Sequence, residues 1–100
     1  MWYAIIAKDR PDSLAARLAA RPAHLERLRE LQAQGRVLLA GPLPAIDAVD
    51  PGPAGFLGSL LVLEFESLSE ARAWAEADPY RVSGVFESLD VQPFRKVFPE

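Results

Sequence analysis

Two long apolar runs constrain the fold of this chain more than any other sequence feature. Segments 2–7 and 56–65 are apolar at most positions and contain aromatic and β-branched residues, which favour strands. A strand that faces solvent on one side alternates apolar and polar residues, whereas a strand covered on both faces is apolar nearly throughout. We therefore predict that these two segments are the central strands of one sheet.

Two further segments have strand character and are predicted to flank the central strands. Segment 37–40 is apolar and ends at a Gly-Pro pair, and the proline- and glycine-rich segment 43–55 is predicted to be a loop. Segment 88–97 contains Pro93, which has no backbone N–H to donate to a neighbouring strand. Pro93 therefore predicts an edge strand or a bulge.

The remaining periodic segments predict helices. A proline inside a helix removes one backbone donor, so Pro22 predicts two helical segments, 13–20 and 22–34, which meet at a bend. Ser67 and Glu70 have the spacing of a capping box, in which a serine side chain caps the helix three residues before a glutamate. This pair predicts the start of the last long helix.

The predicted order of elements is strand, helix, strand, strand, helix, strand. With the first and third strands central, this order predicts a ferredoxin-like α+β sandwich: a four-stranded antiparallel sheet of order 4-1-3-2 with both helices on one face. A chain of 100 residues forms one such domain, residues 1–100. The face without helices would expose apolar side chains of the central strands. We therefore predict that a second copy covers it, in a homodimer or higher homo-oligomer.

Composition excludes several classes of function. The net charge is −3 and the basic residues are scattered, which argues against nucleic-acid binding. The chain has no cysteine and one histidine, which excludes a thiolate or histidine-rich metal site within one chain. It has no phosphate-binding glycine motif, and we expect no cofactor. No run is long enough to span a membrane or resembles a signal peptide, so we expect a soluble cytoplasmic protein without a membrane partner.

The candidate catalytic residues are two ionisable side chains that point toward the predicted core. His24 shares a helical face with Leu28 and Leu31, and Asp78 continues the apolar face of the next helix. Both helices lie on one side of the predicted sheet, so the two side chains can meet, and a His–Asp pair suits general acid–base catalysis. Each residue also has a structural alternative: a satisfied core histidine, and an aspartate that caps the helical turn begun by Pro79.

Three other polar residues are candidates for substrate binding. Ser59 interrupts a central strand on a face that it shares with leucines, and it could be a third polar group near the same cleft. Tyr80 and Arg95 could bind an anion. Each has a structural alternative, since serine also serves as a small strand residue, and tyrosine and arginine are common at surfaces.

Short motifs across nearly the whole chain resemble the YciI-like family. They are the runs 21–25 and 35–42, Gly58-Ser59-Leu60, Ala73-Trp74-Ala75 and Ala77-Asp78-Pro79-Tyr80. The resemblance implies a dimeric ferredoxin-like α+β barrel, similar to muconolactone isomerase-type proteins, with a His–Asp active site on His24 and Asp78. One branch of the family is associated with dechlorination of a chlorinated hydroxyquinone in aromatic degradation.

Residues and resemblance together lead to two hypotheses of different classes. In the first, the protein is a lyase- or isomerase-type enzyme, dehalogenase-like, that acts on a small cyclic oxygenated or aromatic-degradation metabolite. His24 would move the proton, and Asp78 would orient the imidazole and stabilise its charge. In the second, the protein is a non-catalytic small-ligand-binding or stress-related dimer with a structural His–Asp pair. A nitrogen of His24 that is reachable within a cleft favours the enzyme, and a sealed pair favours the structural role.

Overall fold

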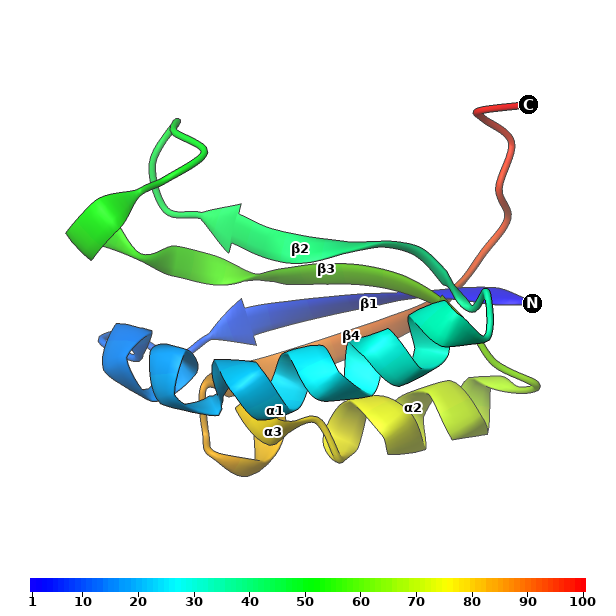
Figure 1. The fold of residues 1–100 in the computed structure, drawn as a ribbon, viewed down its shortest axis with the longest axis horizontal. Helices are drawn as coiled ribbons and strands as arrows, with labels where there is room; N and C mark the ends of the chain where they lie inside the picture. The colour runs from blue at the N-terminus through cyan, green and yellow to red at the C-terminus, as the bar shows by residue number, and fades with distance from the viewer.

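The computed structural model describes residues 1–100, and its elements follow the predicted order of strands and main helices. The elements are β1 (Trp2–Asp9), α1 (Leu14–Ala33), β2 (Val37–Pro44), the 3-10 turn η1 (Gly52–Ala54), β3 (Phe56–Glu64), α2 (Leu68–Glu76), the short α3 (Pro79–Val82) and β4 (Phe86–Phe94) (Figure 1). The two apolar runs of the sequence thus become β1 and β3.

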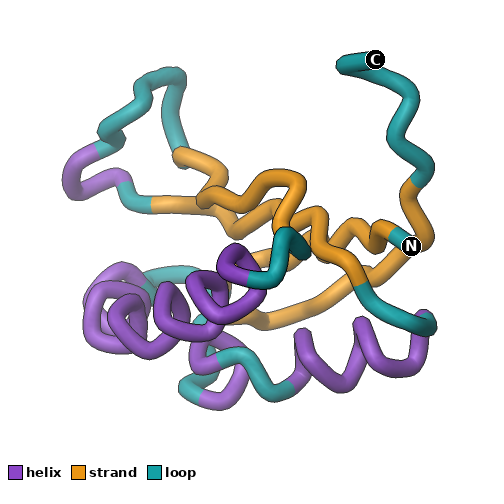
Figure 2. Tube along the Cα trace, turned by 45° about the vertical axis from the view of Figure 1, so that its right-hand side comes forward, coloured by secondary structure: helices purple, strands orange, loops and turns teal.

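The four strands form one antiparallel sheet in the order β2-β3-β1-β4, with β3 and β1 in the centre. This is the predicted order 4-1-3-2 counted from the other edge. The helices lie on one face of the sheet (Figure 1, Figure 2). The register places Ile5 of β1 opposite Leu61 of β3 and Val91 of β4. The ferredoxin-like α+β fold predicted from the sequence is confirmed.

The core lies between the sheet and the helices. Ile5, Leu61 and Leu63 of the central strands are at most 1% exposed, and Ala71 and Ala75 of α2 pack against the same cluster. Alanine has a short side chain, so α2 can lie close to the sheet there. Each large apolar side chain that is fully buried in this way stabilises the fold by about 1.5–3 kcal/mol.

Helix α1 differs from its prediction, because it runs through Pro22 without interruption. Proline deletes one helical hydrogen bond, but the buried face of the helix continues on both sides of it. Arg17, His24 and Leu31 follow one another at intervals of seven residues and are all buried. Packing of this face outweighs the local cost of the proline, which is about 3 kcal/mol in a free helix. The predicted division of the helix at Pro22 is wrong.

The two edge strands contain prolines. Strand β2 runs on through Pro42 to Pro44 instead of ending at Ala40 as predicted. An edge strand tolerates proline, because one of its sides needs no donor for a neighbouring strand. Strand β4 begins and ends earlier than the predicted segment 88–97, and it is the other edge of the sheet. The prediction that Pro93 marks an edge strand is confirmed.

The second face of the sheet carries no helix (Figure 1). Ile6, Leu39, Leu43 and Phe94 are large apolar side chains between 36% and 47% exposed. The strand register places all four on this face, because residues that pair across strands point to the same side. The loop that contains η1 and the segment after β4 rise on the side away from the helices (Figure 2). None of the helices has the length and apolar character needed to cross a membrane.

Candidate active site

His24 and Asp78 lie in direct contact between α1 and the α2–α3 junction. The Nδ1 atom of His24 is 2.9 Å from Oδ2 and 3.0 Å from Oδ1 of Asp78, and the two residues are 5% and 1% exposed. An ionised carboxylate only accepts hydrogen bonds, so Nδ1 carries the proton and donates. In the neutral form of the ring, this tautomer leaves the Nε2 lone pair of His24 free to accept a proton.

Asp78 has two partners, and its position explains both. It is the N-cap residue of α3, and its Oδ1 accepts a hydrogen bond from the backbone N–H of Tyr80 at 2.9 Å. Pro79 occupies the first helical position, as expected from its fixed φ. The carboxylate is therefore oriented by the helix start, independently of His24, and it meets the imidazole as a fixed acceptor.

Tyr80 covers the imidazole of His24. The two rings are stacked, with centroids 4.1 Å apart and planes inclined by 22°. Burial raises the pKa of the Tyr80 hydroxyl above its ordinary value, and the positive charges of Arg17 and Arg21 only partly offset this. The hydroxyl is therefore protonated at neutral pH and can donate a hydrogen bond to a ligand.

A second buried ion pair lies beside the first. Arg17 donates from Nε to Asp9 Oδ2 at 2.8 Å and from Nη2 to Asp9 Oδ1 at 3.0 Å, and the two residues are 4% and 7% exposed. The same Nη2 donates to Gly58 O at 3.1 Å and to Ser59 Oγ at 2.9 Å. The Arg17 guanidinium also lies over the Tyr80 ring, 4.6 Å from its centroid. Arg17 therefore joins the ends of β1 and β3 to Tyr80.

A cavity of about 360 Å³ opens between α1 and the strands β2 and β3. Its polar wall is formed by Arg17, Arg21, His24, Ser59 and Tyr80, and its other side chains are mainly apolar. Nδ1 of His24 is engaged by Asp78. Nε2, the other polar atom of the ring, has no hydrogen-bond partner and is not among the fully buried unpaired atoms, so it is not sealed, and the residue lines this cavity. The volume falls in the range of small-molecule sites.

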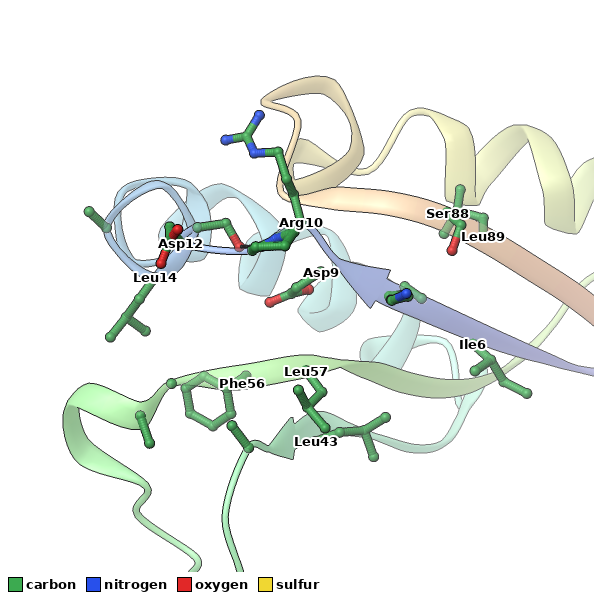
Figure 3. A pocket seen from close by; sticks show the side chains of 18 of the residues that line it. Ile6, Asp9, Arg10, Asp12, Leu14, Leu43, Phe56, Leu57, Ser88 and Leu89 are labelled. Carbon is green, nitrogen blue, oxygen red and sulfur yellow. Dashed lines mark hydrogen bonds between the residues drawn. The ribbon is translucent and has the colours of Figure 1, made fainter.

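A larger cavity of about 1120 Å³ lies beyond the end of β1 (Figure 3). Asp9 lies on its wall, with Phe56, Leu57 and Leu43 across from it (Figure 3). It includes neither His24 nor Asp78. Because Asp9 lines this cavity and its partner Arg17 lines the smaller one, the ion pair lies between the two.

Four of the five candidate residues from the sequence come together here. His24, Ser59 and Tyr80 line the smaller cavity, and Asp78 lies directly behind His24. Arg95 does not join them, because it follows the end of β4 as an exposed residue and lines neither cavity. No three His, Cys, Asp or Glu side chains lie close enough together to hold a metal ion.

Three polar residues of this region, Arg17, Arg21 and Asp9, were not among the candidates predicted from the sequence. Arg17 precedes His24 by seven residues and so shares its helical face, and Asp9 continues the odd-numbered buried positions of β1. Both signals were present in the sequence. They are easily overlooked because arginine and aspartate are rarely buried unless they are paired, and the pairing is a property of the tertiary structure.

Comparisons with known proteins agree with this architecture. The profile of the YCII-related domain matches residues 1–95. Protein YciI of Escherichia coli is 58% identical over 98 residues, covering 98% of this chain and all of that protein. An uncharacterised protein of Haemophilus influenzae is 51% identical over the same coverage.

A solved enzyme structure is also similar. It is 5-chloro-2-hydroxyhydroquinone dehydrochlorinase from Burkholderia phenoliruptrix in complex with 2,5-dihydroxybenzoquinone. The TM-score is 0.82 and the sequence identity 34%, with 95% of this chain and 94% of that chain covered. The family match, the close relatives and this shared fold establish that the chain belongs to the YCII-related family.

Proposed function

We propose that this protein is a lyase- or isomerase-type enzyme in which His24 and Asp78 form an acid–base pair acting on a small cyclic oxygenated molecule. One observation carries the proposal: Asp78 holds Nδ1 of His24, and the ring lines a cavity with Nε2 unengaged. A purely structural pair has no need of a cavity at its free nitrogen. A general base needs one, because it must come within hydrogen-bond reach of the proton it removes.

The chemistry follows from the tautomer. Nε2 of His24 takes a proton from a ring hydroxyl, or from a saturated ring carbon beside a carbonyl, and the electron pair of the broken bond moves into the ring, toward a carbonyl oxygen or a leaving group. The resulting imidazolium is stabilised by the Asp78 carboxylate at 2.9 Å. In an isomerisation the imidazolium returns the proton to another atom, and in an elimination the leaving group departs as an anion. Each route is a series of proton and electron-pair shifts without net oxidation.

The volume of the cavity and the similarity to a known enzyme support this substrate class. A cavity of about 360 Å³ can take a single substituted ring. The similar dehydrochlorinase acts, by its name, on a chlorinated hydroxyhydroquinone and was solved with a dihydroxybenzoquinone. A dehalogenase-like elimination on such a ring is therefore the first reaction to test.

A non-catalytic role is the second candidate, and one observation favours it. Asp78 caps α3 as well as contacting His24, so the carboxylate would be needed for the fold even without catalysis. In that case the protein is a small-ligand-binding or stress-related dimer.

Replacing His24 by alanine is expected to abolish turnover while the protein stays folded. Loss of a general base costs about 10²–10⁴-fold in rate. The measurement is the initial rate with 5-chloro-2-hydroxyhydroquinone and a panel of phenols and lactones, together with a thermal melt.

Asp78→Asn should lower both the rate and the melting temperature, because the cap oxygen remains but the charge beside the imidazole is lost. Glu30→Gln, exposed on α1, is the control and should change neither. Turnover by His24→Ala at the wild-type rate would exclude the acid–base role.

We also propose that the protein assembles through the sheet face that carries Ile6, Leu39, Leu43 and Phe94. Exposure of this apolar face to water is unfavourable. A second copy of the chain can bury it in an interface of at least about 1,000 Å². Light scattering at micromolar concentration should give the mass of a dimer or a higher homo-oligomer. Ile6→Lys should shift it toward the monomer, whereas Val82→Lys, at a 76% exposed position on α3, should not. A wild-type monomer under these conditions would contradict the proposal.

A further inference from the structure

The cavity at His24 is rich in donors and contains no carboxylate. Arginine, serine and tyrosine side chains form its polar wall, and none of its twelve lining residues is an aspartate or glutamate. Asp9 and Asp78, the two buried carboxylates nearby, are engaged by Arg17 and His24. A ligand that enters therefore meets positive charge and hydrogen-bond donors.

Arg17 is held in place before any ligand arrives. Its Nε and Nη2 atoms make hydrogen bonds to several acceptors, which include both oxygens of Asp9. The one fully buried side-chain nitrogen or oxygen without a partner in the protein is Nη1 of Arg27. Nη1 of Arg17 makes none of these bonds and is not fully buried, and Arg17 lines the cavity beside the Tyr80 hydroxyl, which is close enough to accept a hydrogen bond from it. A donor that is already oriented loses little conformational entropy when it binds.

Ser59 and Tyr80 add two further donors. The Ser59 oxygen accepts from Arg17 at 2.9 Å, so its own O–H remains available to another acceptor. Burial holds the Tyr80 hydroxyl protonated, as described above. Both side chains line the cavity together with Arg17, so three hydrogen-bond donors surround the same space.

Arg21 supplies the charge that is not balanced within the protein. It follows Arg17 by one helical turn, lines the same cavity and is exposed. The five ion pairs of the structure do not include it. Its charge acts on the Tyr80 hydroxyl, so it lies within electrostatic reach of the donors deeper in the cavity. Arg17, by contrast, is neutralised by Asp9.

We propose that this cavity binds a small organic anion, a single-ring carboxylate or phenolate, with the charged oxygen held by Arg17 and Arg21 and the ring among the apolar side chains. Leu25, Leu28 and Phe56 provide the apolar surface. The inference rests on the proposed function, since it names the substrate class of the same site. The same two arginines also suit proton removal by His24, because they stabilise negative charge that develops on a ring oxygen.

The test compares benzoate with benzamide, which have the same ring and nearly the same shape but differ in charge. Titration calorimetry on the wild-type protein should show benzoate binding at least about tenfold more tightly, the usual effect of a hydrogen bond to a charged group. Arg21→Gln should remove most of this difference, and Arg21→Lys should restore part of it. Arg29→Gln, exposed on the same helix but outside the cavity, should behave as wild type.

Two results would overturn the inference. One is equal affinity for the two compounds, or no detectable binding of benzoate. The other is benzoate binding that Arg21→Gln and Arg29→Gln weaken to the same extent. Arg21 is exposed and unpaired, so its variants are expected to fold and the test does not depend on altering the buried Arg17.

The inference and the proposed function can fail separately. Charge-dependent benzoate binding that needs Arg21, together with turnover of a panel compound that His24→Ala leaves at the wild-type rate, would keep the anion site and overturn the acid–base role. Turnover that needs His24, together with equal binding of benzoate and benzamide, would keep the acid–base role and overturn the anion site.

Discussion

Gly58→Ala is expected to destabilise the protein by about 3 kcal/mol or more, the upper range for overpacking a core. A Cβ atom at this position would lie 1.9 Å from the backbone oxygen of Ala7 and 2.9 Å from its carbonyl carbon. Both atoms belong to backbone, so no side chain can rotate away to relieve the contact. The central strands β1 and β3 would have to move apart where Lys8 pairs with Gly58.

The same change should disturb the candidate site. The carbonyl oxygen of Gly58 accepts from Arg17 Nη2 at 3.1 Å, and Ser59 is the next residue. The measurement is the free energy of unfolding from chemical denaturation. Gly41→Ala is the matched control, since a Cβ at Gly41 meets nothing within 4 Å and the residue lies on the adjacent strand. It should change stability by less than about 0.5 kcal/mol. Equal effects of the two changes would show that the strands do not approach closely at Gly58.

Arg17→Met is expected to destabilise the protein by about 3–5 kcal/mol, because it leaves Asp9 charged, buried and without its partner. The acceptors at Gly58 and Ser59 would also lose a donor. Asp9→Leu should lower the free energy of unfolding by a similar amount, because it leaves the buried Arg17 guanidinium without its carboxylate partner. For a domain whose total stability is about 5–15 kcal/mol, each single change is a large fraction.

The double variant Arg17→Met, Asp9→Leu should recover much of the loss. With both charges gone, no buried charge remains unpaired, and hydrophobic replacement of a buried ion pair is often neutral. The acceptors at Gly58 and Ser59 still lack the Arg17 donor, so the recovery is incomplete. Chemical denaturation of the four proteins gives a double-mutant cycle, with an expected coupling of about 2 kcal/mol or more. Arg29→Met breaks the exposed pair with Glu26 and should cost less than about 0.5 kcal/mol. Additive effects of the two buried changes would contradict this account.

The sequence by itself determined the strands, their order and the helical face of His24. The apolar runs 2–7 and 56–65 could be stable only as central strands, and Pro93 could lie only at an edge or a bulge. The position of His24 on the buried face of α1 followed from the helical repeat. These features depend on local periodicity, which is visible in the amino-acid sequence alone. Asp78 is buried, but it lies beyond the end of α2, as the N-cap of α3, and does not continue the α2 face as predicted.

The tertiary structure alone decided which buried polar groups meet. His24 and Asp78 are 54 residues apart and Arg17 and Ser59 are 42 apart, so their contacts depend on how the helices lie across the sheet. Arg95 had the right chemistry for an anion site, but the end of β4 carries it away from the cavity. Periodicity tells which side of an element a residue faces. Only the packing of elements sets its partner, because many residues share a face and the register selects among them.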